Sequence, residues 1–410
     1  MWGLKMGCRS VTHIFTTKKF ILSLMMFSFW AAFGISPFIV VFLREQKLDS
    51  VSIGTILSIN SFIGIFGHSV WGTVSDKIKS VKKVFLFCLA ACSSTYGILL
   101  TARTALAIGV VLAVDTFFRS GVASLLDIWF VGCTGGDDRV SYGSLRLWGS
   151  IGFAAVVMFY GRISEGNSVR AIFPYYFFFV LITLVIGSLI KYGGAPPVRT
   201  PGVKGQDQGR LFSNSYYVVF VIFIFMISLP NNPSQTFLPN LFEEVGGDMG
   251  QYGFMHSVKA FIEVPFFFFG KKLLDRFGSV RIVISAAMIY TLQHFLFSIA
   301  STPVQVILTQ FLLGPAYSLY LMGMLYYIHE LAPEELKTSA QTLASALGNG
   351  LSSIVGNFGG GLFIKYIGLR MLYRFGFVSN IVTITLFLLS FRIIGQLKGK
   401  RMTGAKEAKL

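Results

Sequence analysis

The sequence predicts an all-α membrane protein with twelve transmembrane helices in two six-helix bundles. Of its 410 residues, 54% are hydrophobic and only 13% are charged, and the mean hydropathy is +0.68. Soluble domains carry about a quarter charged residues, so this apolar surface indicates a lipid environment. Apolar runs of about 20 residues recur, and a helix of that length spans roughly 30 Å of hydrocarbon. A charged hairpin at 72–83 returns at 270–281, which indicates two copies of one unit.

The predicted spans fall into two sets of six. The first set is 20–43, 51–74, 82–102, 105–131, 142–163 and 170–192, and the second is 212–240, 250–273, 279–299, 303–329, 338–366 and 371–394. The stretch between the sets contains Pro196, Pro197 and Pro201 with several glycines, as expected of a linker. We therefore expect an N-terminal bundle at 1–192, a cytoplasmic linker at 193–211, and a C-terminal bundle with a basic tail at 212–410.

The charge of the chain follows its predicted topology. The net charge of +17 comes from 35 Lys and Arg against 18 Asp and Glu. The basic residues cluster in short loops between the spans, which is typical of loops kept in the cytoplasm, and no nucleic-acid motif accompanies them. We therefore expect a monomeric multi-pass protein of the plasma membrane (the inner membrane in a bacterium), with both termini in the cytoplasm and no nucleic-acid partner.

No enzyme motif is found in the sequence. The run 359–361 of three glycines lies inside an apolar helix, with no strand before it and no lysine after it, so it predicts close helix packing rather than a phosphate-binding loop. The four cysteines lack the paired spacing of a metal site. We therefore expect no enzymatic activity, no cofactor and no metal.

The two charged hairpins carry a family resemblance. The first contains Gly72, Asp76 and Lys77 followed by Lys82 and Lys83, and the second contains Gly270, Asp275, Arg276, Gly278 and Arg281. Two such copies at matched positions resemble the signature loop of the major facilitator superfamily, which is built from repeated helical halves. The resemblance implies that Gly72, Asp76, Lys77, Asp275 and Arg276 belong to cytoplasmic gating loops. The first copy departs from the family pattern, because Lys79 or Ser80 stands where glycine is usual.

A second resemblance lies at the start of the fifth predicted span. The stretch 142–153 holds Arg146 and Trp148 among glycines, and it is similar to the lactose permease-like branch of that superfamily, which includes sugar, phenylpropionate and nucleoside symporters. In lactose permease the arginine at the position matching Arg146 binds sugar hydroxyls and pairs with an acid of the fourth helix. Asp127 lies within one residue of that acid. The resemblance implies that Asp127 and Arg146 bind substrate, and the alternative is a salt bridge that only joins two helices.

Two pairs of opposite charge lie inside predicted spans. Asp115 and Arg119 are four residues apart, as are Lys259 and Glu263, so each pair shares one helix face. Ionisable groups at bilayer depth are costly and face a cavity or a partner. We expect Glu263 to exchange protons, with the other three residues taking part in proton coupling. The alternative is that both pairs are permanent and structural.

Amide and hydroxyl groups supply further substrate-binding candidates. The seventh span contains two prolines, with Asn231 and Asn232 between them and Gln235 two residues after the second. We expect an unwound or kinked segment beside a cavity there. Tyr317 and Asn349 lie in the tenth and eleventh spans. The tenth span lacks the His and Glu that lactose permease uses for proton coupling, and Asn349 replaces a lysine. The alternative for these groups is hydrogen bonding between helices.

These features predict a secondary active transporter that moves a small polar organic solute, sugar-like or related, by alternating access in symport with protons. One alternative is a drug or metabolite exporter of the same fold, and the direction of tracer movement separates the two. A second alternative is a non-transporting membrane sensor, which a long soluble domain would favour. The sequence contains no such domain.

Overall fold

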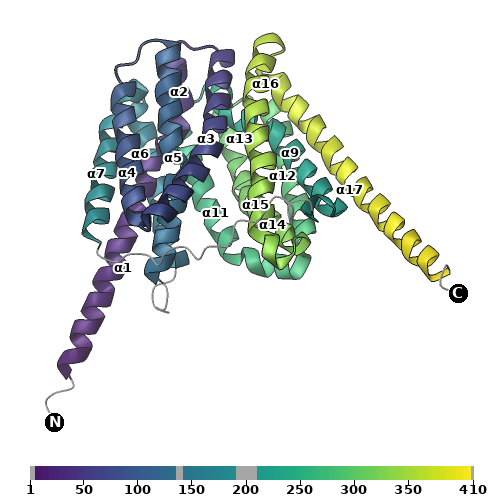
Figure 1. Cartoon of the computed structure of the whole chain (residues 1–410). Helices are drawn as coiled ribbons and strands as arrows, with labels where there is room; N and C mark the ends of the chain where they lie inside the picture. The colour runs from purple at the N-terminus through teal and green to yellow at the C-terminus, as the bar shows by residue number, and fades with distance from the viewer. Residues whose placement is uncertain (1–4, 135–141, 191–209, 408–410) are drawn as a thin grey trace. The chain divides into compact units, whose positions relative to one another are not determined.

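The computed structural model describes residues 5–134, 142–190 and 210–407 of the chain. Every regular element in these ranges is a helix, which confirms the predicted all-α class (Figure 1). The predicted linker at 193–211 lies outside the described residues except at its end.

The first half of the chain contains nine helical elements in its described part. They are α1 (Lys5–Phe33), η1 (Ser36–Phe38), α2 (Ile39–Glu45), α3 (Ser50–Ile78), α4 (Val81–Leu99), α5 (Ala105–Thr134), α6 (Tyr142–Ser164), η2 (Val169–Ile172) and α7 (Phe173–Leu189). In the second half the described elements begin with α9 (Ser215–Thr236), α10 (Leu238–Glu244), α11 (Met249–Phe277), α12 (Ser279–Ile299), α13 (Pro303–Leu308) and α14 (Gln310–Leu331). They end with η3 (Glu334–Leu336), α15 (Lys337–Ser345), η4 (Ala346–Leu351), α16 (Ser352–Tyr366) and α17 (Leu369–Glu407).

Ten stretches of the described residues are long and apolar enough to cross a membrane. The two other predicted spans, 250–273 and 338–366, are also helical. The first lies in α11, which carries His256, Lys259 and Glu263 near its middle and Lys271 and Lys272 towards its end. The second is divided among α15, the π-helix η4 and α16. Both of these spans are therefore helical. They differ from the ten apolar stretches because the first carries several ionisable side chains and the second is interrupted by a π-helix.

The described residues form two compact units. Unit 1 comprises Met1–Leu48, Ile63–Val198 and Gly247–Val264, and unit 2 comprises Asp49–Phe62, Arg199–Gly246 and Pro265–Leu410. The first part of α3 thus belongs to unit 2, and the first part of α11 belongs to unit 1. The simpler bundle boundaries at 192 and 212 remain a prediction.

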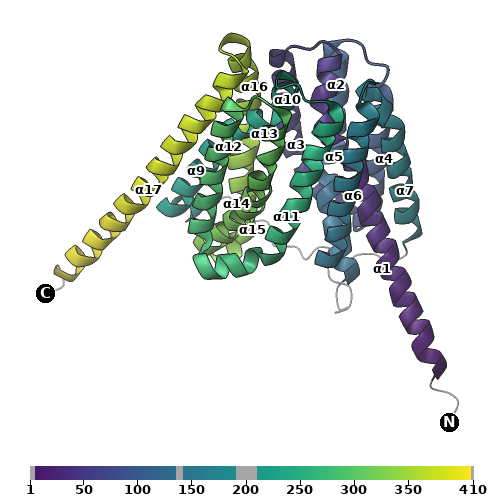
Figure 2. The ribbon, with the colours of Figure 1, turned by 180° about the vertical axis from the view of Figure 1, so that it is seen from behind.

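Unit 1 is held together by large buried side chains between close helices. Helix α1 packs along α6 and α7, and α4 packs along α5 (Figure 2). The rings of Phe29, Phe85 and Trp129 are fully buried between them. Burying side chains of this size supplies much of the packing energy of a helical unit.

Unit 2 is organised around α9 and α12. Helix α9 packs along α16 and α17, and α12 packs along α14 and α17. The rings of Phe223 and Phe387 lie 4.3 Å apart between α9 and α17. On α16, a Cβ at Gly356 would come within 2.5 Å of the Leu229 carbonyl oxygen of α9, so this approach requires glycine. Small residues that let helix backbones meet are a common means of packing inside membranes.

The internal repeat appears in the backbone of the turns. Six described residues have positive φ: Lys47, Lys79 and Gly166 in the first half, and Gly246, Gly278 and Gly368 in the second. Each turn of the first half matches a turn of the second half in its place among the helices. The two halves therefore turn the chain in the same way, although two of the six positions hold lysine.

An arginine at the start of the last helix in each half repeats the same set of contacts. In unit 1, Arg170 Nη1 donates to the Leu100 carbonyl at 3.4 Å, and Nη2 donates to Gln46 Oε1 at 2.9 Å. In unit 2, Arg370 Nη1 donates to the Ala300 carbonyl, and Nε donates to Glu244 Oε1 at 2.7 Å. Each arginine joins the ends of three segments of its own unit, which supports the two-copy interpretation.

Candidate functional site

The predicted pair on α11 forms in unit 1. Lys259 Nζ lies 3.9 Å from Glu263 Oε1, and the two side chains are 23% and 18% exposed. One helical turn separates them, so the helix itself places both charges on one face. The Glu263 carboxyl also interacts electrostatically with Arg146 of α6.

Arg146 of α6 stacks on an aromatic ring of α1. Its guanidinium carbon lies 3.9 Å from the centroid of the Trp30 ring, which is the geometry of a cation–π contact. Gly149 makes room for this contact, because a Cβ there would come within 2.5 Å of Trp30 Cδ1 and 3.0 Å of Arg146 Nη1. The sequence indicated Arg146 as a site residue but did not indicate Trp30 as its partner, because nothing in a single sequence pairs two distant helices.

His256 adds a further polar group on α11. Its ring packs against Tyr252 with centroids 4.7 Å apart, and the positive charge of Lys259 acts on the ring. Within the described residues, His256 Nε2 and Trp30 Nε1 are buried and have no hydrogen-bond partner. We call Trp30, Arg146, His256, Lys259 and Glu263 the polar cluster.

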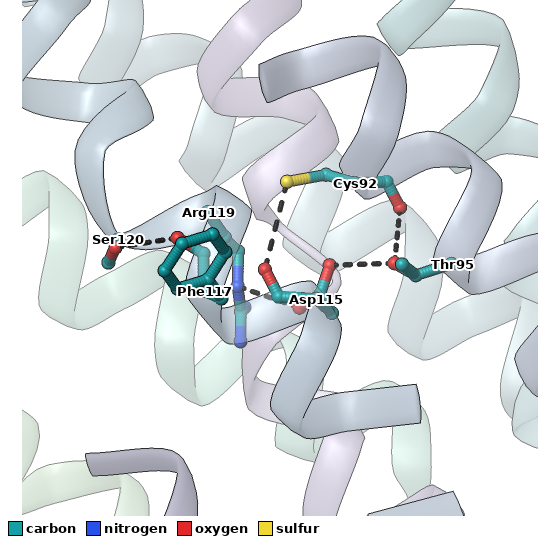
Figure 3. A network of polar contacts seen from close by, with 6 residues as sticks. All are labelled: Cys92, Thr95, Asp115, Phe117, Arg119 and Ser120. Atoms are coloured by element: carbon teal, nitrogen blue, oxygen red, sulfur yellow. Dashed lines mark hydrogen bonds and ion pairs between the residues drawn. The ribbon is translucent and has the colours of Figure 1, made fainter. Parts of the chain in front are cut away.

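Asp127, the predicted partner of Arg146, lies on α5 in unit 1 and is half-buried. Its ion pair with Arg146 remains a prediction. The other predicted pair of α5 forms: Arg119 Nε lies 3.0 Å from Asp115 Oδ2, and the Asp115 side chain is only 1% exposed. The Thr95 hydroxyl of α4 donates to Asp115 Oδ1 at 3.1 Å, so the carboxylate lies between a cation and a hydroxyl (Figure 3).

A small cavity lies beside Arg119 within unit 1. It offers about 10 Å³ of space, and its walls include Ser36, Cys92, Tyr96, Arg119 and Tyr176. A cavity of this size holds about one water molecule. The Tyr96 hydroxyl is buried without a partner among the described residues. Thr95, Tyr96 and Tyr176 carry no signal in the sequence that links them to Asp115, since that relation comes from packing between helices.

Two predicted substrate residues of unit 2 form hydrogen bonds between helices. Asn232 Nδ2 of α9 donates to the Ser352 hydroxyl of α16 at 2.9 Å, and the Ser228 hydroxyl donates to Asn349 Oδ1 at 3.2 Å. Thr236 extends the series by donating to Asn357 Oδ1 at 2.8 Å. These contacts match the alternative interpretation of hydrogen bonds that join helices. Asn349 itself lies in the π-helix η4, an element that often occurs at functional sites.

The predicted unwinding of residues 230–235 is not present. Helix α9 continues through Pro230 and Pro233 to Thr236. Pro233 leaves the Leu229 carbonyl without its helical donor, and Gly356 packs closely against that oxygen. Neighbouring helices therefore accommodate the prolines without a break. Asn231 and Gln235 are half-buried on this continuous helix, and Tyr317 of α14 is 40% exposed.

The two predicted gating loops are short turns between long helices. Helix α3 continues through Gly72, Asp76 and Lys77, and α4 begins behind Ser80, whose side chain accepts a hydrogen bond from the Lys83 N–H. Lys79 takes a φ of 54° in this turn. In the second loop, α11 continues through Asp275 and Arg276, and Gly278 has a φ of 80°. The missing glycine of the first loop is thus Lys79, which adopts positive φ in its place.

This all-helical fold with paired charged hairpins and intramembrane ion pairs defines the class of major facilitator transporters. The chain belongs to the MFS_1-like family, whose model matches residues 20–375. The structure is similar to that of a mutant form of the nucleoside transporter NupG, with a TM-score of 0.82 and 18% identity, covering 91% of this chain and 99% of that one.

Curated relatives are similar along most of the sequence. Maltose permease of Geobacillus stearothermophilus is 28% identical over 380 residues, which cover 91% of this chain and 94% of the permease. Transporter YwbF of Bacillus subtilis is 26% identical over 374 residues, covering 90% and 91%. Nucleoside permease NupG of Escherichia coli is 23% identical over 371 residues, covering 84% and 87%. The chain is therefore a multi-pass membrane transporter, and the prediction that it is not an enzyme is confirmed by these permease relatives.

Proposed function

We propose that the protein moves a small polar organic solute, such as a sugar or a nucleoside, by alternating access in symport with protons. The observation that carries this proposal is the polar cluster, in which Lys259 and Glu263 form an ion pair and Arg146 of α6 acts electrostatically on Glu263. Ionisable residues inside membrane-spanning helices are typical of substrate and ion pathways. Relatives named for maltose, nucleoside and sucrose transport support the solute class.

In this proposal Glu263 carries the proton, with Lys259, Asp115 and Arg119 modulating its charge. Substrate contacts come from Asp127, Arg146, Asn231, Asn232, Gln235, Tyr317 and Asn349. The hairpins with Gly72, Asp76, Lys77, Asp275 and Arg276 close the cytoplasmic side. Basic loops favour cytoplasmic termini, and we propose that the protein acts as a monomer in the plasma membrane.

The test is transport in liposomes that contain the purified protein and a pH-sensitive dye. Addition of maltose, sucrose or uridine on one side should move protons together with the transported solute. Glu263→Gln should abolish accumulation against a gradient and spare solute exchange, because the amide cannot take up a proton. The matched control is Glu334→Gln, which makes the same change at a side chain that is 83% exposed.

Continued accumulation by the Glu263→Gln protein would show that Glu263 is not the proton site. Solute movement without proton movement would reject symport but retain the transporter. Extrusion of a loaded tracer under a proton gradient would instead favour the exporter.

A further inference from the structure

Two donor groups of the polar cluster, the Arg146 guanidinium and the Trp30 N–H, have no acceptor among the described residues. Within the described residues, Arg146 is in contact with the face of Trp30 and makes no hydrogen bond or ion pair. A guanidinium carries five N–H donors. The Trp30 N–H is buried and equally without a partner. Donors left unsatisfied away from water cost free energy, so a ligand that accepts from them gains affinity.

The charges of the polar cluster also favour an anionic ligand. The Glu263 carboxyl has two cationic neighbours, Lys259 and Arg146. Protonation of Glu263 would remove a negative charge that acts on both of these cations. Uncompensated charge in a low-dielectric interior is strongly unfavourable. An anionic group on the substrate would restore the balance at the moment when the proton is bound.

The geometry also suits one particular group. The Arg146 guanidinium carbon lies 3.9 Å from the centroid of the Trp30 ring, and the guanidinium N–H groups have no acceptor among the described residues. A planar guanidinium binds a planar carboxylate through two parallel hydrogen bonds. The indole N–H of Trp30 belongs to the same stacked pair and offers a further donor at the ring edge.

We propose that Trp30 and Arg146 together bind a carboxylate, so that the transported solute is an organic acid rather than a neutral sugar or nucleoside. The inference rests on the proposed transport function and narrows its substrate class. Trp30 acts twice in this site, since its ring orients the guanidinium and its N–H contacts the ligand.

The test compares pairs of solutes that differ in one acidic group. Binding of D-glucuronate and D-glucose, and of D-galacturonate and D-galactose, is measured on the purified full-length protein by calorimetry and thermal unfolding at constant ionic strength. We expect the acid of at least one pair to bind at least about tenfold more tightly than its neutral partner, which is typical of hydrogen bonds to a charged group. If no acid exceeds its neutral partner, the proposal is overturned.

Two variants locate the acid-binding group. Trp30→Phe keeps a ring for Arg146 and removes the N–H, so it should lower the preference for the acid over its neutral partner about tenfold. Arg146→Gln should abolish the preference for the acid. The control is Trp148→Phe on α6, at an indole that is 45% exposed, and it should bind as the unmodified protein does. Unchanged acid preference in Trp30→Phe would remove Trp30 from the site.

The outcomes separate this inference from the proposed function. Transport of maltose or uridine with no preference for acids would overturn the inference and leave the transporter. Binding of an acid that depends on Trp30 and Arg146, without transport of any solute in liposomes, would retain the acid site and reject transport.

Discussion

Two lysines occupy backbone positions that hold glycine in the second half of the chain. Lys47 and Lys79 have φ values of 61° and 54°, and their counterparts Gly246 and Gly278 have φ of 80°. Left-handed backbone costs an ordinary residue roughly 1–2 kcal/mol, whereas glycine adopts it freely. The first half of the chain therefore carries local strain that the second half avoids.

Lys79→Gly should stabilise the protein. Removal of the left-handed penalty is partly offset by the greater freedom of glycine in the unfolded chain, so we expect a gain of about 0.5–1 kcal/mol. Thermal unfolding in detergent measures the change. Lys77→Gly is the matched control, because Lys77 is helical and glycine there should cost about 1 kcal/mol. Equal destabilisation by both substitutions would contradict the assigned turn.

Asp49 stabilises the beginning of α3 in a pH-dependent way. Its Oδ1 accepts a hydrogen bond from the Ser52 N–H at 3.0 Å. Hydrogen bonds from the side chain and the backbone of Ser52 lower the pKa of Asp49 below its ordinary value. The stabilisation is therefore complete above the unfolded-state pKa of about 3.9 and is lost as the pH falls through the lower folded-state pKa.

Asp49→Ala should cost about 1 kcal/mol at pH 7, as expected for the loss of a helix cap. The difference between the two proteins should shrink as the pH falls below about 3.9. Asp49→Asn is the control, because an amide oxygen can still cap the helix and does not titrate near this pH. Unfolding measured from pH 7 to pH 3 tests the prediction, and a difference that grows on acidification would contradict it.

At the scale of elements, α9 and α16 meet through glycine. A Cβ at Gly360 would overlap Pro233, and a Cβ at Gly356 would come within 2.5 Å of the Leu229 oxygen. Gly359, in the same run of three glycines, has no atom within 4 Å of the position of its Cβ. Gly360 therefore has no room for a side chain, whereas Gly359 faces open space.

Gly360→Ala should destabilise unit 2 by about 1–3 kcal/mol, because the added methyl group forces the two helices apart. Gly359→Ala is a matched control one residue away, and it should be neutral or stabilising by up to about 1 kcal/mol. Thermal unfolding of the two variants decides the matter. A loss in Gly359→Ala as large as that in Gly360→Ala would contradict the assigned contact, because alanine has the higher helix propensity and Gly359 has no neighbour within 4 Å of its Cβ position.

The hydrogen bonds between α9 and the η4–α16 segment bear on the predicted substrate residues. Asn232 and Asn349 are joined to Ser352 and Ser228, respectively. Such bonds between membrane helices contribute about 0.6–2 kcal/mol each. These two residues therefore have a structural role in the described structure, and any contact with substrate would be additional to it.

At the scale of the whole molecule, the matching contacts of two arginines show most directly that the two halves of the chain repeat one unit. Arg170 lies in η2, directly before the last long helix of the first half, and Arg370 lies at the start of α17. Each arginine binds a carbonyl at the end of the third long helix of its half, at Leu100 and Ala300. Each also binds a side chain from the segment after the first helix. Helix ends leave carbonyls without donors, and the guanidinium supplies them.

Arg370→Gln should lower the stability of the protein by about 2 kcal/mol, since it removes charged hydrogen bonds to two carbonyls and one carboxylate. Arg170→Gln should have an effect of the same sign. The control is Arg374→Gln, one turn along α17 at an exposed position, where we expect a change within about 0.5 kcal/mol. Thermal unfolding in detergent measures the stability of each variant. Equal stability of all three variants would contradict the prediction.

Much of the site was predictable where the interaction is local. The pairs Asp115–Arg119 and Lys259–Glu263 follow from a spacing of four residues on a helix, and both form. The contacts of Arg146 with Trp30 and of Asp115 with Thr95 join different helices and were not predicted. The unwinding expected of α9 from its prolines did not occur, because the cost of a proline depends on what packs against the carbonyl it leaves unpaired.

The sequence by itself determined the all-helical membrane class, the positions of the spans, the repeat of the two hairpins and the ion pairs within single helices. These features depend on apolar length and on spacing along one helix, and both are written in the order of residues. Only the tertiary structure decided that Trp30 stacks on Arg146, that Asn232 and Asn349 hydrogen-bond neighbouring helices, and that Lys79 adopts positive φ. Those depend on which helix faces meet and on how each turn closes, and packing in three dimensions settles both.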